Sequence, residues 1–355
     1  MKNKLLKIKP YIKGFQPLNK KNIKLNTNEN SYYSNLKIIK QILKEIKFFG
    51  NKLKFYPDGD SDIIKREISR YYNINKNKIA ISNGSDEILA NIFITFLKSK
   101  KKLYLIDITY SFYESFIKLY KINYKLIKLN KNFSINIKKI KKNNNILINN
   151  PNAPVGKSLN NLEIKVILKN FKSLIIIDET YIDFEENSFI KLIKNIKNVL
   201  IVQTFSKSKS LAGLRIGFLI TNKNLIKKIE SVKNSLNSYP VSIISQISVK
   251  NIIKNNSHFE KIKNKIIENK MYLISKLKKL KFKIIKSNTN FILTTNKNIN
   301  INKLLKFLNK KNIFLRKFEI PKIENYLRIT IGKKKEIKII NKNIKNFIKF
   351  LIKKN

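Results

Sequence analysis

The stretch QTFSKSKSLAGLRIGF, residues 203–218, is the most informative part of this 355-residue chain. Lysine is abundant everywhere, but the chain has only eight glycines and five arginines, and this stretch holds two of the glycines and one of the arginines. Glycine allows close backbone approach, and arginine offers a planar, two-pronged donor that lysine cannot replace. The grouping of Gly213 and Arg215 shortly after Lys207 therefore indicates a functional loop.

The formal net charge of +54 would suit binding to nucleic acid or to an anionic membrane surface. The lysines, however, are spread along the whole chain, and Asn, Ile and Lys dominate every segment. Dispersed charge of this kind is typical of solvated faces and favours a compositional bias. A basic nucleic-acid-binding protein stays the competing interpretation from a different class.

The absence of cysteine excludes disulfides, thiolate metal sites and a cysteine nucleophile. The only histidine, His258, lies in a polar helical stretch, so no multi-histidine metal site is predicted. The first residues, MKNKLLKIKP, lack the apolar region of a signal peptide, and no apolar run reaches the roughly 20 residues of a membrane helix. We expect a cytoplasmic protein without a bound metal.

Four short apolar runs, residues 103–107, 145–149, 173–178 and 199–202, each end in a polar cluster. They are rich in Ile, Leu and Val, which predicts buried parallel strands. Between them lie segments whose apolar residues have helical spacing, such as residues 159–171 and 189–196. Strands that alternate with helices predict an open α/β sheet. Ligands bind beyond the carboxyl ends of such strands, so the polar clusters are expected to meet at one edge.

Residues 81–97 predict a turn followed by an amphipathic helix, whose free N–H groups form an anion site. After about residue 240 the pattern changes to a long lysine-rich helical region, then short strands and a terminal helix at residues 335–353. The second half therefore predicts a smaller α+β domain.

The residues expected at the shared edge include a lysine, an aspartate, an arginine, hydroxyl groups, aromatic rings and a helix N-terminus: Gly84, Ser85, Asp86, Tyr110, Asn152, Asp178, Tyr181, Ser206, Lys207 and Arg215. A lysine that binds a phosphorylated pyridine covalently would use all of these groups. The edge is therefore a candidate cofactor site.

With these motifs the chain resembles the fold-type I, pyridoxal-phosphate-dependent aminotransferases, and within them the histidinol-phosphate aminotransferases. The resemblance covers about residues 25–332 and rests on LNTNEN, YPDG, SNGSDE, TYSFY, NPNAPVG, IIDETYIDF, FSKSKSLAGLRIGF, SNTNFIL and LRITIG, in family order. It implies a large domain with a mostly parallel sheet flanked by helices, and a smaller α+β domain. The expected boundaries are an N-terminal arm at 1–40 that packs on the small domain, a cofactor-binding domain at 41–245 and a small domain at 246–355.

The resemblance also implies the catalytic roles in binding pyridoxal 5'-phosphate. Lys207 corresponds to the lysine that binds the cofactor covalently and carries protons. Asp178 corresponds to the carboxylate that faces the pyridine nitrogen, and Tyr181 to the hydroxyl that faces the ring oxygen. The family commonly has Asn where this chain has Ala153. Either Asn152 supplies the missing amide or Tyr181 acts alone, and Asn152 is favoured because an unpaired buried oxygen is costly.

The phosphate is expected to lie against Arg215, Ser206 and the backbone of residues 84–86, because arginine suits phosphate oxygens. Tyr110 is expected to stack on the cofactor ring. Tyr56, in YPDG, resembles the tyrosine that reaches the partner subunit's cofactor phosphate, which implies a homodimer with shared sites.

Arg316, Arg328 and Asn28 are the predicted substrate-binding residues. The two arginines match family positions that receive the anionic ends of substrates. Arg328 would take a carboxylate of glutamate or 2-oxoglutarate, and Arg316 the phosphate of histidinol phosphate or a distal carboxylate.

The implied reaction, part of histidine biosynthesis, moves an amino group between L-histidinol phosphate and 2-oxoglutarate to give imidazole acetol phosphate and L-glutamate. A related aromatic aminotransferase and a threonine-phosphate decarboxylase would share the scaffold, and fold alone does not separate them.

Overall fold

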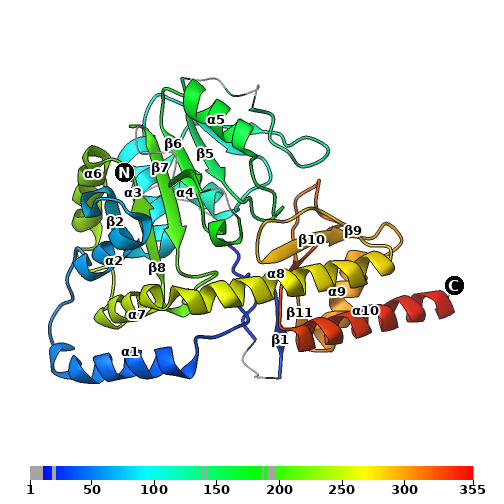
Figure 1. The fold of residues 1–355 in the computed structure, drawn as a ribbon. Helices are drawn as coiled ribbons and strands as arrows, with labels where there is room; N and C mark the ends of the chain where they lie inside the picture. Colours follow the sequence, from blue (N-terminus) through cyan, green and yellow to red (C-terminus); the bar gives the residue numbers. More distant parts are fainter. Residues whose placement is uncertain are drawn as a thin grey trace, which may run out of the picture.

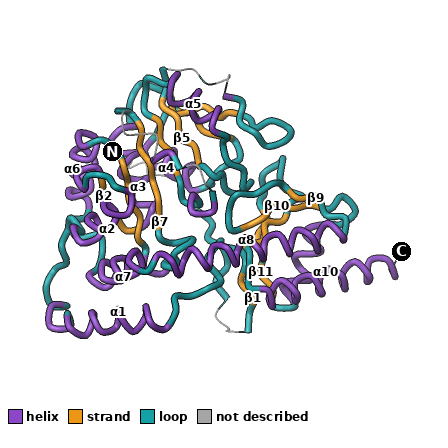
Figure 2. Tube along the Cα trace, viewed as in Figure 1, coloured by secondary structure: helices purple, strands orange, loops and turns teal. Residues whose placement is uncertain are grey.

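A computed structural model describes residues 11–17, 21–137, 140, 143–185, 188–190 and 197–354 of the chain. Helices cover both faces of a large sheet, and a smaller sheet with its own helices lies beside it (Figures 1 and 2). The predicted fold class is confirmed. The long helix α8 (Asn256–Lys279) runs from the large sheet toward the smaller one (Figure 1).

Within the described residues the large sheet has seven strands in the order β2-β8-β7-β6-β5-β3-β4. The strands are β2 (Ile79–Asn83), β3 (Leu103–Ile106), β4 (Tyr124–Ile127), β5 (Asn145–Asn149), β6 (Ile175–Asp178), β7 (Val199–Thr204) and β8 (Ile216–Ile220). Strands β3, β5, β6 and β7 are the four predicted ones, and they run parallel to their neighbours in this group. Their carboxyl ends therefore share one edge, as expected.

Strands β2 and β8 correct the sequence-based assignment. Residues 82–84 were expected to form a turn and residues 216–218 to belong to the cofactor loop, but Asn83 pairs with Ile216 in an antiparallel ladder. No separate turn is needed because Gly84 adopts φ 83° and carries the chain directly from β2 into a helix. A left-handed backbone of this kind favours glycine.

Both faces of the large sheet are buried. Successive strand residues point to opposite faces, so Ile176 of β6 joins one apolar cluster while its neighbours Ile175 and Ile177 join the other. The α-helices that precede α8 in the chain are α1 (Leu36–Phe48), α2 (Asp62–Tyr72), α3 (Gly84–Ile92), α4 (Phe112–Tyr120), α5 (Asn161–Asn170), α6 (Lys223–Leu236) and α7 (Ile243–Lys254). The predicted helix at 159–171 is confirmed as α5, whereas most of the one predicted at 189–196 lies outside the described residues.

The smaller sheet has the strand order β12-β13-β10-β9 and is antiparallel throughout. Beside it, β1 of the N-terminal segment pairs in parallel with β11. The remaining elements are β1 (Ile23–Lys24), β9 (Lys283–Ile284), β10 (Phe291–Thr295), α9 (Ile301–Lys310), β11 (Ile313–Phe314), β12 (Arg316–Lys317), β13 (Leu327–Thr330) and α10 (Lys334–Lys354). The division of the chain at residues 40 and 245 stays a prediction.

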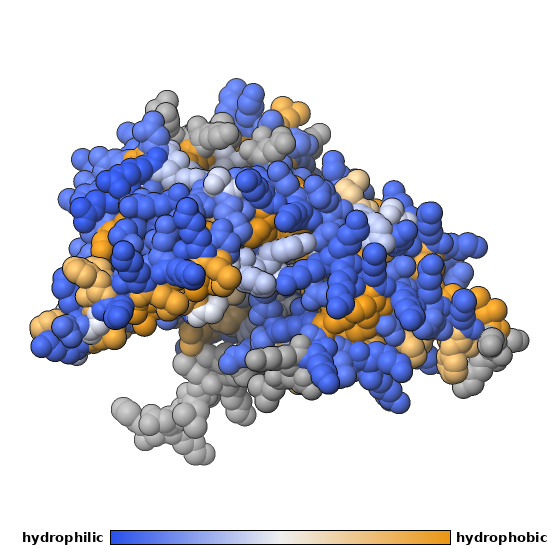
Figure 3. Space-filling model, turned by 60° about the horizontal axis from the view of Figure 1, so that its bottom comes forward, coloured by the Kyte–Doolittle hydropathy of each residue, from blue (hydrophilic) through white to orange (hydrophobic). Residues whose placement is uncertain are grey.

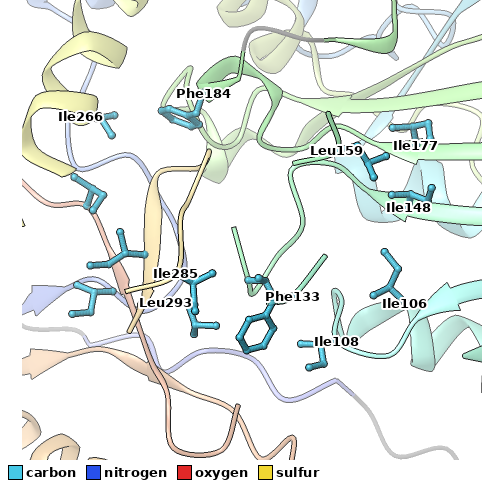
Figure 4. Close-up of a cluster of buried hydrophobic side chains, with 14 of the residues drawn as sticks. Ile106, Ile108, Phe133, Ile148, Leu159, Ile177, Phe184, Ile266, Ile285 and Leu293 are labelled. Carbon is cyan, nitrogen blue, oxygen red and sulfur yellow. The ribbon is translucent and has the colours of Figure 1, made fainter. Parts of the chain in front are cut away.

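One apolar cluster extends from the large sheet to the small one. Ile148 and Ile177 of the large sheet and Leu293 of the small sheet belong to it, with Phe133 and Leu159 also among its members (Figure 4). The two sheets thus share a core. None of the described helices combines the length and hydrophobicity that a membrane span requires.

Gly217 lies where β8 meets the first turn of α3. A Cβ added there would stand 2.4 Å from the backbone carbon of Gly84 and 2.4 Å from the backbone nitrogen of Ser85. We expect Gly217→Ala to push α3 away from β8 and to lower the free energy of unfolding by about 1–3 kcal/mol, as overpacking does. Urea denaturation measures the change.

Gly213 provides the matched control, because a Cβ there meets nothing within 4 Å. Gly213→Ala should change the free energy of unfolding by no more than about 0.5 kcal/mol. Equal stability of the two variants would contradict the close contact at Gly217.

Candidate active site

Lys207 lies in the loop between β7 and β8, at the carboxyl edge of the large sheet. Its Nζ atom is 3.5 Å from the carbonyl oxygen of Thr27 and 5.7 Å from the centre of the Tyr181 ring. Segments that are about 180 residues apart in the sequence therefore meet at this lysine.

Two adjoining cavities meet at Lys207. The first, the Asp178 cavity, has a volume of ≈ 130 Å³ and is lined by Ser85, Asp86, Tyr110, Asn149, Ala153, Asp178, Thr180, Tyr181, Thr204, Ser206, Lys207 and Arg215. The second, the Arg328 cavity, has a volume of ≈ 150 Å³, and its lining includes Tyr11, Asn28, Tyr110, Ala153, Tyr181, Lys207, Arg316, Phe318 and Arg328. Lys207 and Tyr181 border both cavities and can act on contents of either.

Asp178 ends strand β6 and is almost fully buried. One carboxylate oxygen accepts a hydrogen bond of 2.5 Å from the Tyr113 hydroxyl, and the other accepts bonds from the Thr180 hydroxyl (2.6 Å) and backbone N–H (3.0 Å). Burial raises the pKa of Asp178, and the hydrogen bonds from Thr180 and Tyr113 lower it in part. A cation beside this carboxylate would favour its charged form.

The sequence did not assign Tyr113 or Thr180 a role in the site. Burial first, and then the nearby Asp178 charge, raise the pKa of Tyr113 well above its usual value, so its hydroxyl remains a donor at neutral pH. Thr180 follows Asp178 by two residues, a spacing at which a side chain often bonds back to the preceding carboxylate. That spacing could have revealed Thr180 from the sequence. For Tyr113 the sequence offers only its position three residues after Tyr110.

The first turn of α3 and Arg215 form the polar end of the Asp178 cavity. Arg215 takes the left-handed backbone at φ 52°, and its Nη2 atom lies 3.1 Å from Asp86 Oδ2. A Cβ at Gly84 would stand 2.6 Å from Nη2, so glycine lets the guanidinium reach the helix start. Here a guanidinium meets the N-terminus of a nine-residue helix, which together suit an anion.

Two hydroxyl groups border the same end. Ser206 is buried, and its Oγ accepts a hydrogen bond of 2.9 Å from Thr204. The Tyr110 hydroxyl donates to Asp86 Oδ1 at 3.3 Å. Burial, followed by the charge of Asp86, raises the pKa of Tyr110 well above its usual value. Tyr110 is therefore neutral, and its ring borders both cavities.

Asn152 does not line the Asp178 cavity, contrary to the sequence-based expectation. Its Nδ2 donates to the carbonyl oxygen of Ile108 at 3.0 Å, and its side chain borders a different cavity. Asn149, at the end of β5, lies in the Asp178 cavity instead. It donates to the carbonyl oxygen of Asp178 at 3.0 Å and accepts from the backbone of Ala153 at 2.6 Å. The strand end, rather than the following loop, thus brings an amide to the cavity.

Tyr56 lies outside both cavities. It is 81% exposed and stacks on Tyr239, with 4.6 Å between the ring centres. Its predicted role requires a second subunit and stays a prediction.

Arg328 is half-buried between two aromatic rings, with its guanidinium 5.2 Å from the centre of Phe291 and 5.0 Å from that of Phe318. One Nη atom donates to the carbonyl oxygen of Asn26 at 2.9 Å, while Nε is buried without a hydrogen-bond partner. Loss of water lowers the pKa of Arg328 to about 10; Tyr181 opposes this shift, and Arg316 adds to it. Arg328 is therefore charged at neutral pH.

Arg316 is the second arginine of the Arg328 cavity and donates to the carbonyl oxygen of Ile12 at 3.2 Å. Among the described residues, no carboxylate forms an ion pair with Arg316 or Arg328. Two half-buried guanidinium groups without a paired carboxylate attract negative charge, so this cavity favours an anion. Tyr11 also borders it, and no sequence pattern had pointed to that residue.

Asn28 borders the Arg328 cavity, where it was predicted, but its side chain is already bonded. Its Nδ2 donates to the Tyr181 hydroxyl at 2.8 Å, and its Oδ1 accepts from Thr330 at 3.1 Å. The structure thus brings together all the predicted residues except Asn152 and Tyr56.

The sheet topology and this lysine-centred site are those of an aminotransferase, and the aminotransferase class I and II model matches residues 20–344. The chain belongs to this family, whose members depend on pyridoxal phosphate. It is 42% identical to a histidinol-phosphate aminotransferase of Clostridium botulinum over 343 residues, which cover 96% of each chain. The predicted resemblance is confirmed.

Solved structures agree. The histidinol-phosphate aminotransferase of Clostridium acetobutylicum superimposes with a TM-score of 0.82 and 26% identity, over 92% of this chain and 98% of that one. The enzyme of Sinorhizobium meliloti, solved in complex with pyridoxal 5'-phosphate, has a TM-score of 0.82 at 15% identity, over 93% and 91% of the two chains. The latter likeness shows the fold alone.

Glu179 follows Asp178 and was not singled out in the sequence. It is buried, and its carboxylate accepts bonds from Gln203 (2.7 Å), Ser188 (2.8 Å) and the backbone of Phe189 (2.7 Å). Burial raises the pKa of Glu179 to about 7, although these three hydrogen bonds oppose the shift. The residue anchors the segment after β6 to the large sheet.

The raised pKa of Glu179 predicts a pH dependence of stability. Between about pH 4.5 and 7 the folded state binds more protons than the unfolded state, so the free energy of unfolding falls as pH rises. Glu179→Gln lacks this contribution. The free energy of unfolding of the wild type minus that of Glu179→Gln should therefore decrease from about pH 4.5 to pH 7, by at most about 1.4 kcal/mol per pH unit.

Denaturation curves at several pH values measure the difference. Glu319→Gln, at a carboxylate that is 84% exposed, controls for the loss of one negative charge. A constant difference between wild type and Glu179→Gln across this pH range would contradict the raised pKa.

Proposed function

We propose that this aminotransferase moves the amino group of L-histidinol phosphate to 2-oxoglutarate, with pyridoxal phosphate bound in the Asp178 cavity. The observation that carries the proposal is the position of Lys207 between two groups of anion-binding residues. On one side are Arg215 and the start of α3, and on the other are Arg316 and Arg328. A phosphorylated cofactor and an anionic substrate on either side of one lysine require this arrangement.

The residues of the Asp178 cavity fit the cofactor. Arg215, Ser206 and the N–H groups at the start of α3 would hold its phosphate. Asp178, whose oxygens accept hydrogen bonds from Tyr113 and Thr180, would face the ring nitrogen, and Tyr110 would flank the ring. The cofactor supplies an electron sink when bound. The close approach of Arg215 to Gly84 supports this fit, because a Cβ at residue 84 would collide with the guanidinium and displace it.

Lys207 has two tasks in this scheme. Its Nζ would hold the cofactor covalently and, when free, would move a proton to or from the reacting carbon of the substrate. Its position on the border of both cavities supports the two tasks, because one amine reaches cofactor and substrate. Tyr110, Ala153 and Tyr181 line both cavities together with Lys207.

Arg328 and Arg316 would receive the anionic ends of the two substrates in turn. A guanidinium can bind a carboxylate or a phosphate through two parallel hydrogen bonds. 2-Oxoglutarate carries two carboxylates and L-histidinol phosphate carries a phosphate, so both use at least one of these arginines. L-Histidinol phosphate and a free aromatic amino acid each carry one anionic group, so the number of arginines does not separate these two donors. Their separation depends on the substrate assay.

Lys207→Ala should abolish the absorbance band of the lysine-bound cofactor and also amino transfer, because the variant lacks the amine that would bind the cofactor. Lys227→Ala, at an exposed lysine on α6, is the matched control and should retain both. The measurement is the visible absorbance of the purified protein with added pyridoxal phosphate, followed by an assay with L-histidinol phosphate and 2-oxoglutarate.

Three outcomes separate the alternatives. A cofactor band that changes on addition of L-histidinol phosphate supports the proposal. A band that changes only with an aromatic amino acid, or with release of carbon dioxide from threonine phosphate, assigns a different substrate. Absence of the band from the wild-type protein would remove the enzyme function and favour salt-dependent nucleic-acid binding.

A homodimer with shared sites belongs to the same proposal. Apolar side chains are exposed on α1 and in the segment after it, among them Leu43, Phe48 and Phe55. Figure 3 shows this side of the molecule, where apolar groups lie among hydrophilic ones. Tyr56 extends from the same segment and would reach the partner's phosphate end. Exposed apolar groups near one another are typical of interaction surfaces.

Shared sites predict complementation between two inactive variants. Tyr56→Ala and Lys207→Ala should each lose most activity, while a mixture refolded together should recover about a quarter of it, because half of the dimers are mixed and each has one intact site. A mixture that stays inactive, or a fully active Tyr56→Ala variant, would contradict a shared site.

A further inference from the structure

Asn28 joins three parts of the molecule at the border of the Arg328 cavity. It lies in the N-terminal segment, bonds to Thr330 of β13 in the small sheet, and bonds to Tyr181 next to the large sheet. It is 1% exposed and takes the left-handed backbone at φ 58°. The Asn290 side chain also donates to its carbonyl oxygen at 2.9 Å. Four hydrogen bonds thus hold one buried residue in an uncommon backbone conformation.

Thr330 fixes which end of the Asn28 amide faces Tyr181. The backbone N–H of Asn28 donates to Thr330 Oγ1 at 3.1 Å, so the hydroxyl proton of Thr330 is free to donate elsewhere. It donates to Asn28 Oδ1, also at 3.1 Å. The amide oxygen therefore faces Thr330, and the NH₂ group faces Tyr181. The assignment follows from the donors and acceptors of the neighbours.

The Tyr181 hydroxyl is consequently an acceptor toward Asn28, at 2.8 Å. A phenol has one proton, and a proton cannot point along a bond in which its own oxygen accepts. We infer that Asn28, locked by Thr330, is a positioning residue that turns the Tyr181 proton toward the two cavities beside Lys207. The inference rests on the proposed function and names a residue that sets the donor direction of that site.

The same arrangement strengthens the donor. A hydroxyl that accepts one hydrogen bond becomes polarised and donates a better one, especially where water is excluded. Tyr181 is 6% exposed, and it borders both cavities. An oxygen atom of cofactor or substrate that carries negative charge near Tyr181 would therefore meet a donor already aligned, with no rotation needed.

Strand β13 connects the hydrogen bonds among Thr330, Asn28 and Tyr181 to the Arg328 cavity. Arg328 and Thr330 are two residues apart, so their side chains leave the strand on the same face. Arg328 reaches the Arg328 cavity, while Thr330 holds Asn28. One short strand therefore carries both the cation that binds the substrate and the hydroxyl that orients the Tyr181 donor.

Asn28→Asp should reverse the direction of the hydrogen bond between residue 28 and the Tyr181 hydroxyl, with little other change. Aspartate has nearly the same size and tolerates the left-handed backbone. Its carboxylate would accept from Tyr181 and draw the phenol proton away from the cavities. Thr330→Val removes the lock and keeps the side-chain shape, and Thr330→Ser keeps the hydroxyl. Thr294→Val is the matched control, since it removes a buried threonine hydroxyl of the same sheet that bonds to Lys283 instead.

The first measurement needs no cofactor. 3-Fluorotyrosine at position 181 places a fluorine beside the hydroxyl, and its NMR resonance responds to the direction of the O–H group. We expect a shift in Asn28→Asp and in Thr330→Val, and the unshifted position in Thr330→Ser and Thr294→Val. An unshifted resonance in Asn28→Asp would overturn the inference, whatever the protein catalyses.

The second measurement is a double-mutant cycle on the dissociation constant of pyridoxal phosphate. Asn28→Asp should weaken binding by about tenfold when Tyr181 is present, which corresponds to one hydrogen bond, and by less than about twofold in the Tyr181→Phe background. Equal weakening in both backgrounds would indicate a merely structural role and overturn the inference. If wild type does not bind the cofactor, the proposed function fails, and the fluorine measurement still decides the role of Asn28.

Discussion

The contact between β8 and the first turn of α3 is the constraint on which the site depends. Gly217 has no side chain, and this absence allows the backbone of Gly84 and Ser85 to approach β8. The same approach brings Arg215, at the start of β8, over the open N-terminus of the helix. Without this contact the Arg215 guanidinium and the first turn of α3 would not converge at the Asp178 cavity. Two glycines thus build one end of the cavity.

Much of the fold was predictable because strands β3, β5, β6 and β7 are short runs of Ile, Leu and Val that each end in polar residues. Parallel strands buried on both faces produce this pattern, and their carboxyl ends must meet. Strands β2 and β8 were missed because polar or glycine residues border them: Asn83 ends β2 before Gly84, and Arg215 directly precedes β8. Their pairing is antiparallel and distant in the sequence, which no local pattern records.

The site was predictable wherever one residue type stands out against the lysine background. Arg215, Arg316 and Arg328 all border the cavities. Asn152 was misplaced because asparagine is too common in this chain to be informative, and two neighbouring asparagines differ only in the direction that the strand end gives them. Tyr113, Glu179 and Thr330 matter through buried hydrogen bonds, and such partners emerge only from the three-dimensional packing.

The shared core between the two sheets has a consequence for motion. A rotation of the small sheet against the large one would separate Leu293 and Ile285 from Phe133, at a cost of about 25 cal/mol for each Å² exposed. A hinge between the two sheets is therefore opposed by the very core that they share.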